Sequence, residues 1–309
     1  MNRNVFIDGK AGTTGLQIYD RLQARPDITL LTLSEEERKN PEARRKMLNA
    51  CDIAFLCLPD DASREAVSML ENPDVVVLDT STAHRTLDGW AYGFPELGAD
   101  YLEKLRTGRR IAVPGCHASG FIALVKPLVD AGVVSRDALL VCHSLTGYSG
   151  GGKKMIAEYE DAGRSPLLKA PRQYGLTQQH KHLKEMVKIS GLQSAPAFCP
   201  IVADFYSGME VTVPLFRQTV SGSIEDIRRI YAERYTGPVV TYRADSSEGG
   251  FLSAAACSRK DSMEITVEGN EERILLVARY DNLGKGASGA AVECMNIAMG
   301  IDPTTGLTL

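Results

Sequence analysis

The sequence predicts an α/β fold in two parts, and three observations support this. Short β-rich runs alternate with helical patterns over the first third of the chain. The run at residues 53–58 is fully apolar, which is typical of parallel strands in a sheet covered on both faces. After residue 116 the β-rich runs become longer and mixed, which favours an α+β arrangement. At 309 residues the chain is long enough for two domains or for one large one.

The elements of the first part follow one another as strand and helix. Strands are predicted over residues 5–7, 28–33, 53–58, 75–79 and 110–113, and helices over residues 15–25, 41–50 and 63–70. This alternation predicts a doubly wound, Rossmann-like domain with a parallel sheet.

The second part is predicted to contain a mixed sheet. Its strands are expected over residues 138–146, 205–214, 263–267 and 273–280, with helices over 223–235 and, at the end of the chain, 286–299. The last helix is rich in small residues, and we expect it to return to the first domain. A helix also follows residue 116, but Pro127 falls inside it. Because an interior proline costs about 3 kcal/mol, we expect that helix to kink or end near Lys126.

Composition excludes several classes of function. The net charge of −4 gives no reason to expect a nucleic acid or an anionic membrane as a partner. No apolar run approaches the ~18 residues of a membrane span, and the opening residues do not resemble a signal peptide. Seven irregularly spaced cysteines without a Cys-x-x-Cys pair argue against a disulfide framework and against a zinc site. We expect a reduced, cytoplasmic protein without a metal.

A glycine-rich turn joins the first strand to the first helix. Its residues are Gly9, Gly12, Thr13, Thr14 and Gly15, in the spacing G-x-x-G-x-x-G. Glycines at this place let the main chain approach a pyrophosphate, which the N-terminus of the helix stabilises. The pattern therefore predicts dinucleotide binding, although a purely structural turn is an alternative.

The end of the second strand bears on the choice between NAD and NADP. Ser34 and Arg38, with Lys39, could hold a 2′-phosphate, whereas Glu35 could hold a 2′-hydroxyl. A solvated start of a helix would also explain these charges. We favour NADP.

Cys116 is the candidate nucleophile. It stands in Pro114–Gly115–Cys116, between a β-rich run and a helical pattern. The N-terminus of a helix favours a thiolate over a thiol, and the thiolate is the reactive form. A lone cysteine is more often a small buried hydrophobe, so the assignment depends on its neighbours.

Two histidines downstream are candidates for the acid and base. His180 and His182 lie in a basic segment, and imidazole titrates in the range that general acid-base catalysis needs. On a nascent helix, residues two apart point in different directions, so we expect at most one of them to face Cys116. His117 should point away from the thiol. A basic surface segment is the alternative.

A second glycine-rich stretch, residues 147–154, is predicted to bind an anion. Exposed main-chain N–H groups with adjacent lysines form such sites. Ser149, Gly151, Lys153 and Lys154 are the expected ligands of a phosphate or carboxylate. A flexible loop is the alternative.

Taken together, these motifs resemble the N-acetyl-γ-glutamyl-phosphate reductases of the semialdehyde dehydrogenase superfamily. The resemblance spans nearly the whole chain and includes residues 92–97, 114–116, 149–150, 180–185 and 281–289. The commoner branch has Tyr-Pro-Thr where this chain has His117–Ala118–Ser119, proline in place of Lys184 and arginine in place of Lys153. The chain is therefore similar to the shorter, second branch.

The resemblance implies a reaction, a cofactor and a division of the chain. Cys116 would form a thioester with an acyl phosphate, NADPH would reduce it, and His182 would act as acid and base, with His180 as the fallback. Homodimers or homotetramers and a place in arginine biosynthesis are implied as well. Residues 1–115 with 285–309 would bind NADP, and residues 116–284 would form the catalytic and oligomerisation domain. Further cofactor contacts are expected at Leu58, Pro59, Ser81, Gly150 and Asn282.

Two rival interpretations stay open at this point. The first is a reductase of another acyl phosphate, either β-aspartyl phosphate or a carrier-linked aminoadipyl phosphate. The second is a non-catalytic NADP-binding sensor in which Cys116 is merely buried.

Overall fold

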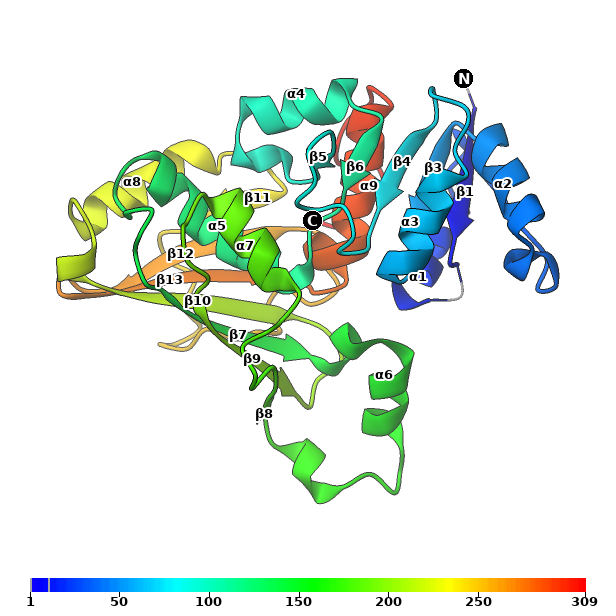
Figure 1. Ribbon diagram of the computed structural model, residues 1–309. Coiled ribbons are helices and arrows are strands. Elements are labelled where there is room, and N and C mark those ends of the chain that lie inside the picture. Colours follow the sequence, from blue (N-terminus) through cyan, green and yellow to red (C-terminus); the bar gives the residue numbers. More distant parts are fainter. Residues whose placement is uncertain (1, 11) are drawn as a thin grey trace. The chain divides into compact units, whose positions relative to one another are not determined.

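The computed structural model describes residues 2–10 and 12–309. Ala11 of the glycine-rich turn and Met1 therefore lie outside the described residues. The chain forms two compact units (Figure 1). Unit 1 comprises Met1–Pro95, Ala99–Gly115 and Ala287–Leu307, and unit 2 comprises Glu96–Gly98, Cys116–Gly286 and Thr308–Leu309.

Unit 1 is built on a parallel sheet with the strand order β2-β1-β3-β4-β6-β5. The strands are β1 (Arg3–Asp8), β2 (Ile28–Leu31), β3 (Ile53–Leu56), β4 (Val76–Asp79), β5 (Ala91–Tyr92) and β6 (Arg110–Ala112). The helices are α1 (Thr13–Leu22), α2 (Pro41–Ala50), α3 (Asp60–Ser68), α4 (Ala99–Thr107) and α9 (Gly289–Ala298). This is a Rossmann-like arrangement, as predicted.

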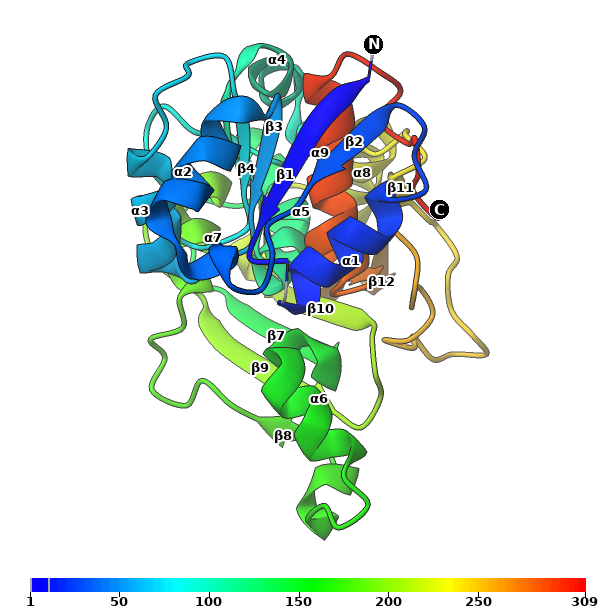
Figure 2. The same cartoon turned by 90° about the vertical axis from the view of Figure 1, so that its right-hand side faces the viewer.

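Both faces of this sheet are buried, which explains why the central parts of its strands are mostly apolar. Val5 and Ile7 point to one face, where the apolar sides of α1, α4 and α9 pack against them. Phe6 points to the other face and packs with Leu48 of α2 and Ala66 of α3. Figure 2 shows α2 and α3 side by side, away from α1 and α9. The alternation of side chains along β1 thus supplies two separate cores. The carboxyl ends of β1 and β3 are thereby fixed next to the glycine-rich turn.

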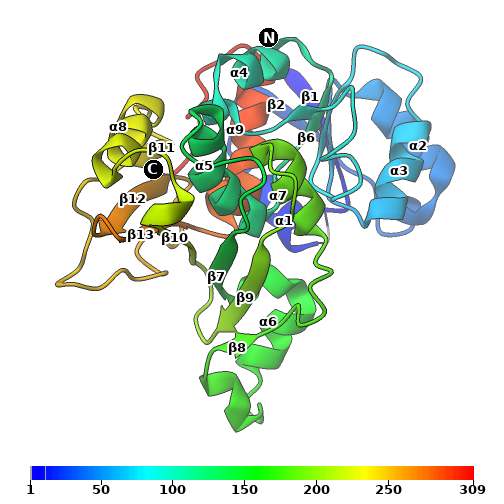
Figure 3. The same ribbon diagram turned by 60° about the vertical axis from the view of Figure 1, so that its left-hand side comes forward.

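Unit 2 contains a mixed sheet with the order β11-β12-β13-β10-β7-β9-β8. The strands are β7 (Val141–Gly147), β8 (Arg172–Gln173), β9 (Ala197–Ala203), β10 (Met209–Phe216), β11 (Val240–Tyr242), β12 (Met263–Gly269) and β13 (Arg273–Tyr280). The helices are α5 (Cys116–Asp130), α6 (Gly152–Glu160), α7 (His182–Ser190) and α8 (Ile224–Arg234). Helices α5, α7 and α8 lie on one face of this sheet, with α5 in the middle (Figure 3). The predicted fold class is confirmed.

The path of α5 corrects one expectation. The helix does not end near Lys126 but runs through Pro127 to Asp130. Pro127 has no N–H to offer the carbonyl of Ala123, four residues earlier. That carbonyl instead accepts a hydrogen bond of 2.6 Å from the hydroxyl of Tyr235. The next carbonyl along, that of Leu124, accepts from the hydroxyl of Tyr231 on α8. Two buried tyrosines therefore supply donors beside the proline, and the helix continues.

Candidate active site

Packing explains two of the three glycines in the glycine-rich turn of unit 1. Gly9 has φ +86°, and a Cβ on it would lie 2.3 Å from the carbonyl oxygen of Cys57. A Cβ on Gly15 would lie 2.6 Å from the carbonyl oxygen of Gly9. Packing therefore explains these two glycines. Gly12 is different, because its Cβ would meet nothing nearer than 3.4 Å. Packing therefore does not require a glycine at this position, and contact of its main chain with a dinucleotide stays a prediction.

The helix that follows this turn is prepared for an anion. Thr13 and Thr14 begin α1, and Gly12 stands before them without a side chain that caps the helix. The first turn of α1 contains no acidic residue. Main-chain N–H groups and the positive end of the helix therefore face outward without a competing carboxylate. This part of the dinucleotide prediction fits the structure.

A cavity of about 610 Å³ opens beside the turn. It extends from the end of β1 to the end of β2, which is where a Rossmann fold holds the adenosine. Residues that line it include Asp8, Gly9, Lys10, Thr32, Leu33, Glu35, Arg38, Lys39, Arg44 and Leu58. The size and position fit a nicotinamide dinucleotide bound along this edge of the sheet.

The predicted adenosine residues have different surroundings. Arg38 lines the cavity and pairs with Glu35 at 2.5 Å, in an ion pair that is largely exposed. Ser34 accepts a hydrogen bond from the main-chain N–H of Glu37, whose carboxylate accepts from the N–H of Ser34. Ser34 is thus bonded to Glu37, the first residue of a short helical turn (Glu37–Lys39), and is not among the residues that line the cavity. The cationic wall comes from Arg38 and Lys39 instead.

A buried ion pair beneath the cavity was not found from the sequence. Arg44 of α2 donates two hydrogen bonds of 3.0 Å to Asp8, at the end of β1. Its remaining amino group reaches Glu65 at 3.1 Å. Burial raises the pKa of Asp8 in spite of Arg44. The pair fixes α2 to the strand that carries the glycine-rich turn. A basic residue within a helical pattern gave no sign of this role.

Two further predicted cofactor positions follow β3 and β4. Pro59 is exposed just before α3, and Ser81 follows β4. The hydroxyl of Ser81 donates to Asp79 at 2.7 Å and accepts from the N–H of Ala83. The same Asp79 binds His84, whose ring stacks on Trp90 with centroids 4.1 Å apart. The hydroxyl proton of Ser81 is therefore already donated to Asp79 within the loop. A ligand could bond only to a lone pair of the hydroxyl oxygen or to the main-chain carbonyl of Ser81.

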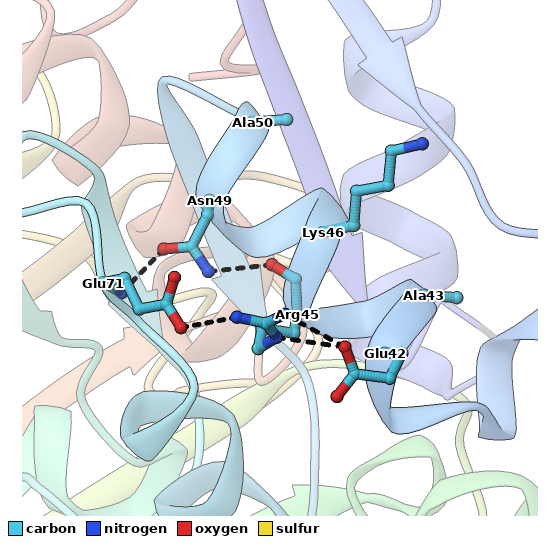
Figure 4. A pocket seen from close by; sticks show the side chains of 7 residues that line it. All are labelled: Glu42, Ala43, Arg45, Lys46, Asn49, Ala50 and Glu71. Carbon is cyan, nitrogen blue, oxygen red and sulfur yellow. Dashed lines mark hydrogen bonds and ion pairs between the residues drawn. The ribbon is translucent and has the colours of Figure 1, made fainter.

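The outer side of α2 carries a shallow, open cavity of about 560 Å³ (Figure 4). Three of its charged groups are paired with one another, because Arg45 binds both Glu42 and Glu71. Asn49 joins the helix to the chain at residues 69–72 by accepting from the N–H groups of Glu71 and Asn72. These contacts explain the cluster as a connection between α2 and the turn after α3.

In unit 2, Cys116 is the first residue of the 15-residue helix α5. It is partly exposed, and the first turn of the helix has no acidic residue. The main-chain carbonyl of Cys116 accepts a hydrogen bond of 2.5 Å from the hydroxyl of Tyr280 on β13. The predicted place of the thiol at a helix N-terminus is therefore what the structure has.

Three imidazoles gather next to this helix. The rings of His180 and His182 have centroids 4.7 Å apart, and each lies 5.7 Å from the ring of His117. The expectation that His180 and His182 point in different directions is wrong. His180 precedes α7, so its side chain does not follow the helical spacing, and its Nδ1 accepts from the N–H of His182. Phe198 of β9 packs against His180 from 5.1 Å.

His117 is buried between two hydroxyl groups. Its Nδ1 lies 2.6 Å from the hydroxyl of Ser144, and its Nε2 lies 2.6 Å from that of Tyr174. Burial, with His180 nearby, lowers the pKa of His117 to about 3, so this imidazole is neutral. Burial, and then the charge of Cys116, raises the pKa of Tyr174. His117 is thus a neutral bridge within the cluster, and burial also lowers the pKa of His180.

The predicted anion loop is held firmly and is not a flexible segment. The N–H groups of Gly147, Tyr148 and Ser149 donate to carbonyls of the chain at residues 205–208. These N–H groups are therefore not exposed, which corrects part of the prediction. Gly150, Gly151, Lys153 and Lys154 are exposed, and the last two begin α6.

The side chain of Asn282 connects two loops and is already hydrogen-bonded to both of them. It is buried, accepts from the N–H of Gly208 at 2.9 Å and donates to the hydroxyl oxygen of Ser149 at 3.0 Å. Because Ser149 accepts this bond, its own proton remains available, and no acceptor for it occurs in the described part of the chain. A buried donor of this kind supports an anion site at Ser149.

Several kinds of site find no support in the described chain. No group of His, Cys, Asp or Glu side chains among residues 2–10 and 12–309 is arranged to hold a metal ion. The seven cysteines form no disulfide within those residues. No helix of the described part is long and apolar enough to span a membrane.

A Rossmann-like unit followed by a mixed-sheet unit is typical of oxidoreductases that use a nicotinamide dinucleotide. Residues 4–105 match the model "semialdehyde dehydrogenase, NAD binding domain", and residues 116–282 match "semialdehyde dehydrogenase, dimerisation domain". The chain belongs to the semialdehyde dehydrogenase family. Members of this family are enzymes, so the alternative of a non-catalytic sensor finds no support.

Curated relatives and solved structures agree with this assignment. The chain is 44% identical to "N-acetyl-gamma-glutamyl-phosphate reductase 2" of a Nostoc species, covering 99% of this chain and 100% of that one. It is also 44% identical to the N-acetyl-gamma-glutamyl-phosphate reductase of Sinorhizobium medicae, covering 97% and 99%. Aspartate semialdehyde dehydrogenase II from Vibrio cholerae has the same fold, with a TM-score of 0.70 at 18% identity over 97% and 99% of the two chains. The resemblance inferred from the motifs is confirmed.

Proposed function

We propose that this protein reduces N-acetyl-γ-glutamyl phosphate to N-acetylglutamate 5-semialdehyde and phosphate with NADPH, in arginine biosynthesis. The observation that carries the proposal is Cys116 at the N-terminus of α5, with an imidazole cluster against the same helix. The relatives at 44% identity are named for this reaction and are matched over their full length. Their substrate is therefore the first candidate here.

The first half of the reaction would be an acyl transfer to Cys116. Its thiolate attacks the carbonyl carbon of the acyl phosphate, a C–S bond forms, and the C–O bond to phosphate breaks. Phosphate leaves with the electron pair of that bond. The proton of the thiol passes to a histidine and then to the departing phosphate, so atoms and charges balance.

The second half would be a reduction of the thioester. When bound, the reduced nicotinamide dinucleotide supplies the hydride that the carbonyl carbon takes up. The tetrahedral species on Cys116 then collapses, the C–S bond breaks, and the aldehyde leaves. The histidine, which takes up a proton from solvent after phosphate has left, gives that proton to the thiolate. The chain thus divides one difficult reduction into two easier steps.

The acid and base would be His182, with His180 as the second candidate. Both rings lie in the cluster that surrounds His117. The Nδ1 of His180 already accepts from the N–H of His182, and burial lowers the pKa of His180. Its capacity to take a further proton is thereby reduced, which favours His182 for this role.

The phosphate would bind at Ser149 and the start of α6. The hydroxyl of Ser149 has its proton available, and Lys153 and Lys154 bring positive charge next to the exposed Gly151. Hydrogen bonds to a charged acceptor of this kind are the stronger ones in proteins. Asn282 and Gly150 would serve the cofactor indirectly, through the position of this loop.

NADP is the proposed dinucleotide. Arg38 and Lys39 line the cavity at the end of β2, and the Glu35 that pairs with Arg38 is 80% exposed. An exposed ion pair is worth little, so a 2′-phosphate could replace the carboxylate at Arg38. A solved relative of the same fold, from Candida albicans at 14% identity and a TM-score of 0.65, is described with NADP.

Reduction of β-aspartyl phosphate is the second candidate function. The solved structures that share this fold at TM-scores of about 0.70 are described as aspartate semialdehyde dehydrogenases. Their identities of 13–18% show the fold alone. The substrate is thus the part of the proposal that needs a direct measurement.

The reaction run in reverse separates these candidates. The enzyme is incubated with phosphate, NADP and either N-acetylglutamate semialdehyde or aspartate semialdehyde, and the formation of NADPH is followed. We expect kcat/KM to be at least ~10²-fold higher with the acetylated substrate, because a pocket that hydrogen-bonds an amide discriminates strongly against its absence. A preference for aspartate semialdehyde would overturn the assignment.

We further propose a cytoplasmic homodimer or homotetramer that acts on small molecules. The sheet of unit 2 has one face away from α5, and apolar side chains on it are exposed, with Phe216 at 59% and Leu275 at 41%. The mass in solution, from light scattering, would distinguish these oligomers from a monomer.

A further inference from the structure

The hydroxyl of Tyr280 bridges the first hydrogen-bonding pair of the helix that carries Cys116. In an α-helix the N–H of residue 120 faces the carbonyl of residue 116. Here the Tyr280 hydroxyl accepts from the N–H of Gly120 at 3.1 Å and donates to the carbonyl of Cys116 at 2.5 Å. Tyr280 is fully buried and ends β13. Its hydroxyl is therefore a fixed point against which the main chain of Cys116 rests.

Gly286 contacts the same cysteine through a close approach of its main chain. A Cβ on Gly286 would lie 3.1 Å from the Cβ of Cys116 and 3.4 Å from its Cα. The first of these distances is tighter than ordinary van der Waals contact. Because Gly286 lacks a side chain, this segment can lie directly against the carbon that carries the thiol.

The chain between Tyr280 and Gly286 is held by internal bonds. The carboxylate of Asp281 accepts from the N–H of Leu283 at 2.7 Å and from the hydroxyl of Ser207. Its carbonyl accepts from the N–H of Gly286 at 3.0 Å. Lys285 binds both oxygens of Glu96, at 2.8 and 2.9 Å. The segment therefore has little freedom to move away from Cys116.

We propose that residues 280–286 act as a clamp that positions Cys116 for attack, with the Tyr280 hydroxyl and Gly286 as its two contact points. This inference deepens the proposed function, since it concerns the orientation of the thioester-forming thiol. Tyr280 and Gly286 are positioning residues and do not touch the reacting atoms. Displacement of a reacting group by about 1 Å can cost ~10²-fold in rate, so a small shift of Cys116 would be measurable.

The clamp also bears on the ionisation of the thiol. A thiolate at the start of a helix is stabilised by the first N–H groups and by the positive end of the helix. Their effect falls off within the first turn, so it depends on where the Cβ of Cys116 lies. Loss of the Tyr280 hydroxyl leaves Gly120 and Cys116 to pair with each other alone, which shifts the peptide that carries the thiol.

Tyr280→Phe tests the clamp, and Tyr235→Phe is its matched control. Both substitutions remove one buried hydroxyl that donates to a main-chain carbonyl of α5, that of Cys116 in one case and that of Ala123 in the other. Each substitution removes one hydrogen-bond donor to α5, so a general loosening of this helix would change the readouts of both variants. Only Tyr280→Phe removes a hydrogen bond to the main chain of Cys116.

Two readouts are compared in the full-length enzyme. The first is the alkylation rate of Cys116 by iodoacetamide against pH, which depends on no acyl substrate. The second is kcat and KM in the reverse reaction. For Tyr280→Phe we expect the midpoint of the alkylation profile to rise by about half a pH unit. We also expect kcat to fall at least ~10-fold while KM stays within ~2-fold.

The outcomes separate the clamp from the proposed function. Equal effects of Tyr280→Phe and Tyr235→Phe on both readouts would overturn the clamp, because the hydroxyl would then be merely structural. A shifted alkylation profile in a protein that oxidises neither semialdehyde would support the clamp and reject the function. Gly286→Ala, which adds a carbon against Cys116, should lower kcat further; unchanged kcat in a folded Gly286→Ala would contradict the second contact point.

Discussion

The side-chain amide of Asn282 donates a hydrogen bond of 3.0 Å to the hydroxyl oxygen of Ser149. The two residues lie 133 positions apart in the sequence. A hydroxyl that accepts from an amide directs its own proton elsewhere. The hydroxyl of Ser149 can therefore donate its proton to a ligand at the loop where phosphate is proposed to bind.

Removal of that donor should weaken phosphate binding selectively. Ser149→Ala is expected to raise the KM for phosphate in the reverse reaction by about 10-fold, the equivalent of one hydrogen bond to a charged acceptor. The KM values for NADP and the semialdehyde are expected to change less than ~2-fold and serve as the internal control. Equal changes in all three would mean that Ser149 only supports the loop.

The histidine variants assign the acid and base. His182→Asn is expected to lower kcat at least ~10²-fold, the low end for general acid-base catalysis. His180→Asn should have a smaller effect, because burial lowers the pKa of His180 and its Nδ1 is already bonded. His143→Asn, at an exposed position on β7, controls for the loss of an imidazole. The larger loss in His180→Asn would exchange the two roles.

Dinucleotide preference depends on the cations at the end of β2. Arg38→Ala is expected to raise the KM for NADPH about 10-fold and to leave the KM for NADH within ~2-fold, since only NADPH has the 2′-phosphate. Arg45→Ala removes an arginine from the other, shallow cavity on α2 and is the matched control. If Arg38→Ala affects NADPH and NADH alike, the cavity binds the adenosine without regard to the phosphate.

The neutral His117 predicts a dependence of stability on pH. Its pKa is about 3 in the folded protein and about 6.5 when unfolded, so the unfolded state binds the extra proton between these values. Stability from this group is complete above pH 6.5 and is lost as the pH falls towards 3. Between pH 7 and pH 5 the loss amounts to roughly 2 kcal/mol. His117→Gln should lack it, and urea unfolding at the two pH values measures the difference. An identical pH slope in both proteins would show that His117 is charged.

The fold can be predicted from the sequence because mostly apolar runs alternate with helical patterns in unit 1 and the glycine-rich turn follows the first strand. The strand β9 was not predicted, because Pro200 lies inside it and proline argues against a strand with neighbours on both sides. Its partner β7 pairs with it along its whole length, which outweighs the missing N–H. Rules that consider only neighbouring residues do not include the pairing of β9 with a distant strand.

The same limit applies at the site. Cys116 and the loop at Ser149 are recognisable from their neighbours in the sequence. The effects of Tyr280 on Cys116 and of Asn282 on Ser149 depend on residues more than a hundred positions away. The interior Pro127 is tolerated for a similar reason, since Tyr235 supplies the missing donor. Hydrogen bonds of this range leave no pattern in the sequence.

The central claim is that Cys116 forms a thioester, and a burst experiment tests it most directly. The enzyme is mixed rapidly with N-acetylglutamate semialdehyde and NADP in the absence of phosphate, so that the thioester forms but is not released. The account predicts a burst of close to one NADPH for each Cys116, followed by slow turnover, and no burst in Cys116→Ser. A burst of equal size in Cys116→Ser would contradict this claim. So would wild-type turnover without phosphate that shows no burst and is as fast as with phosphate.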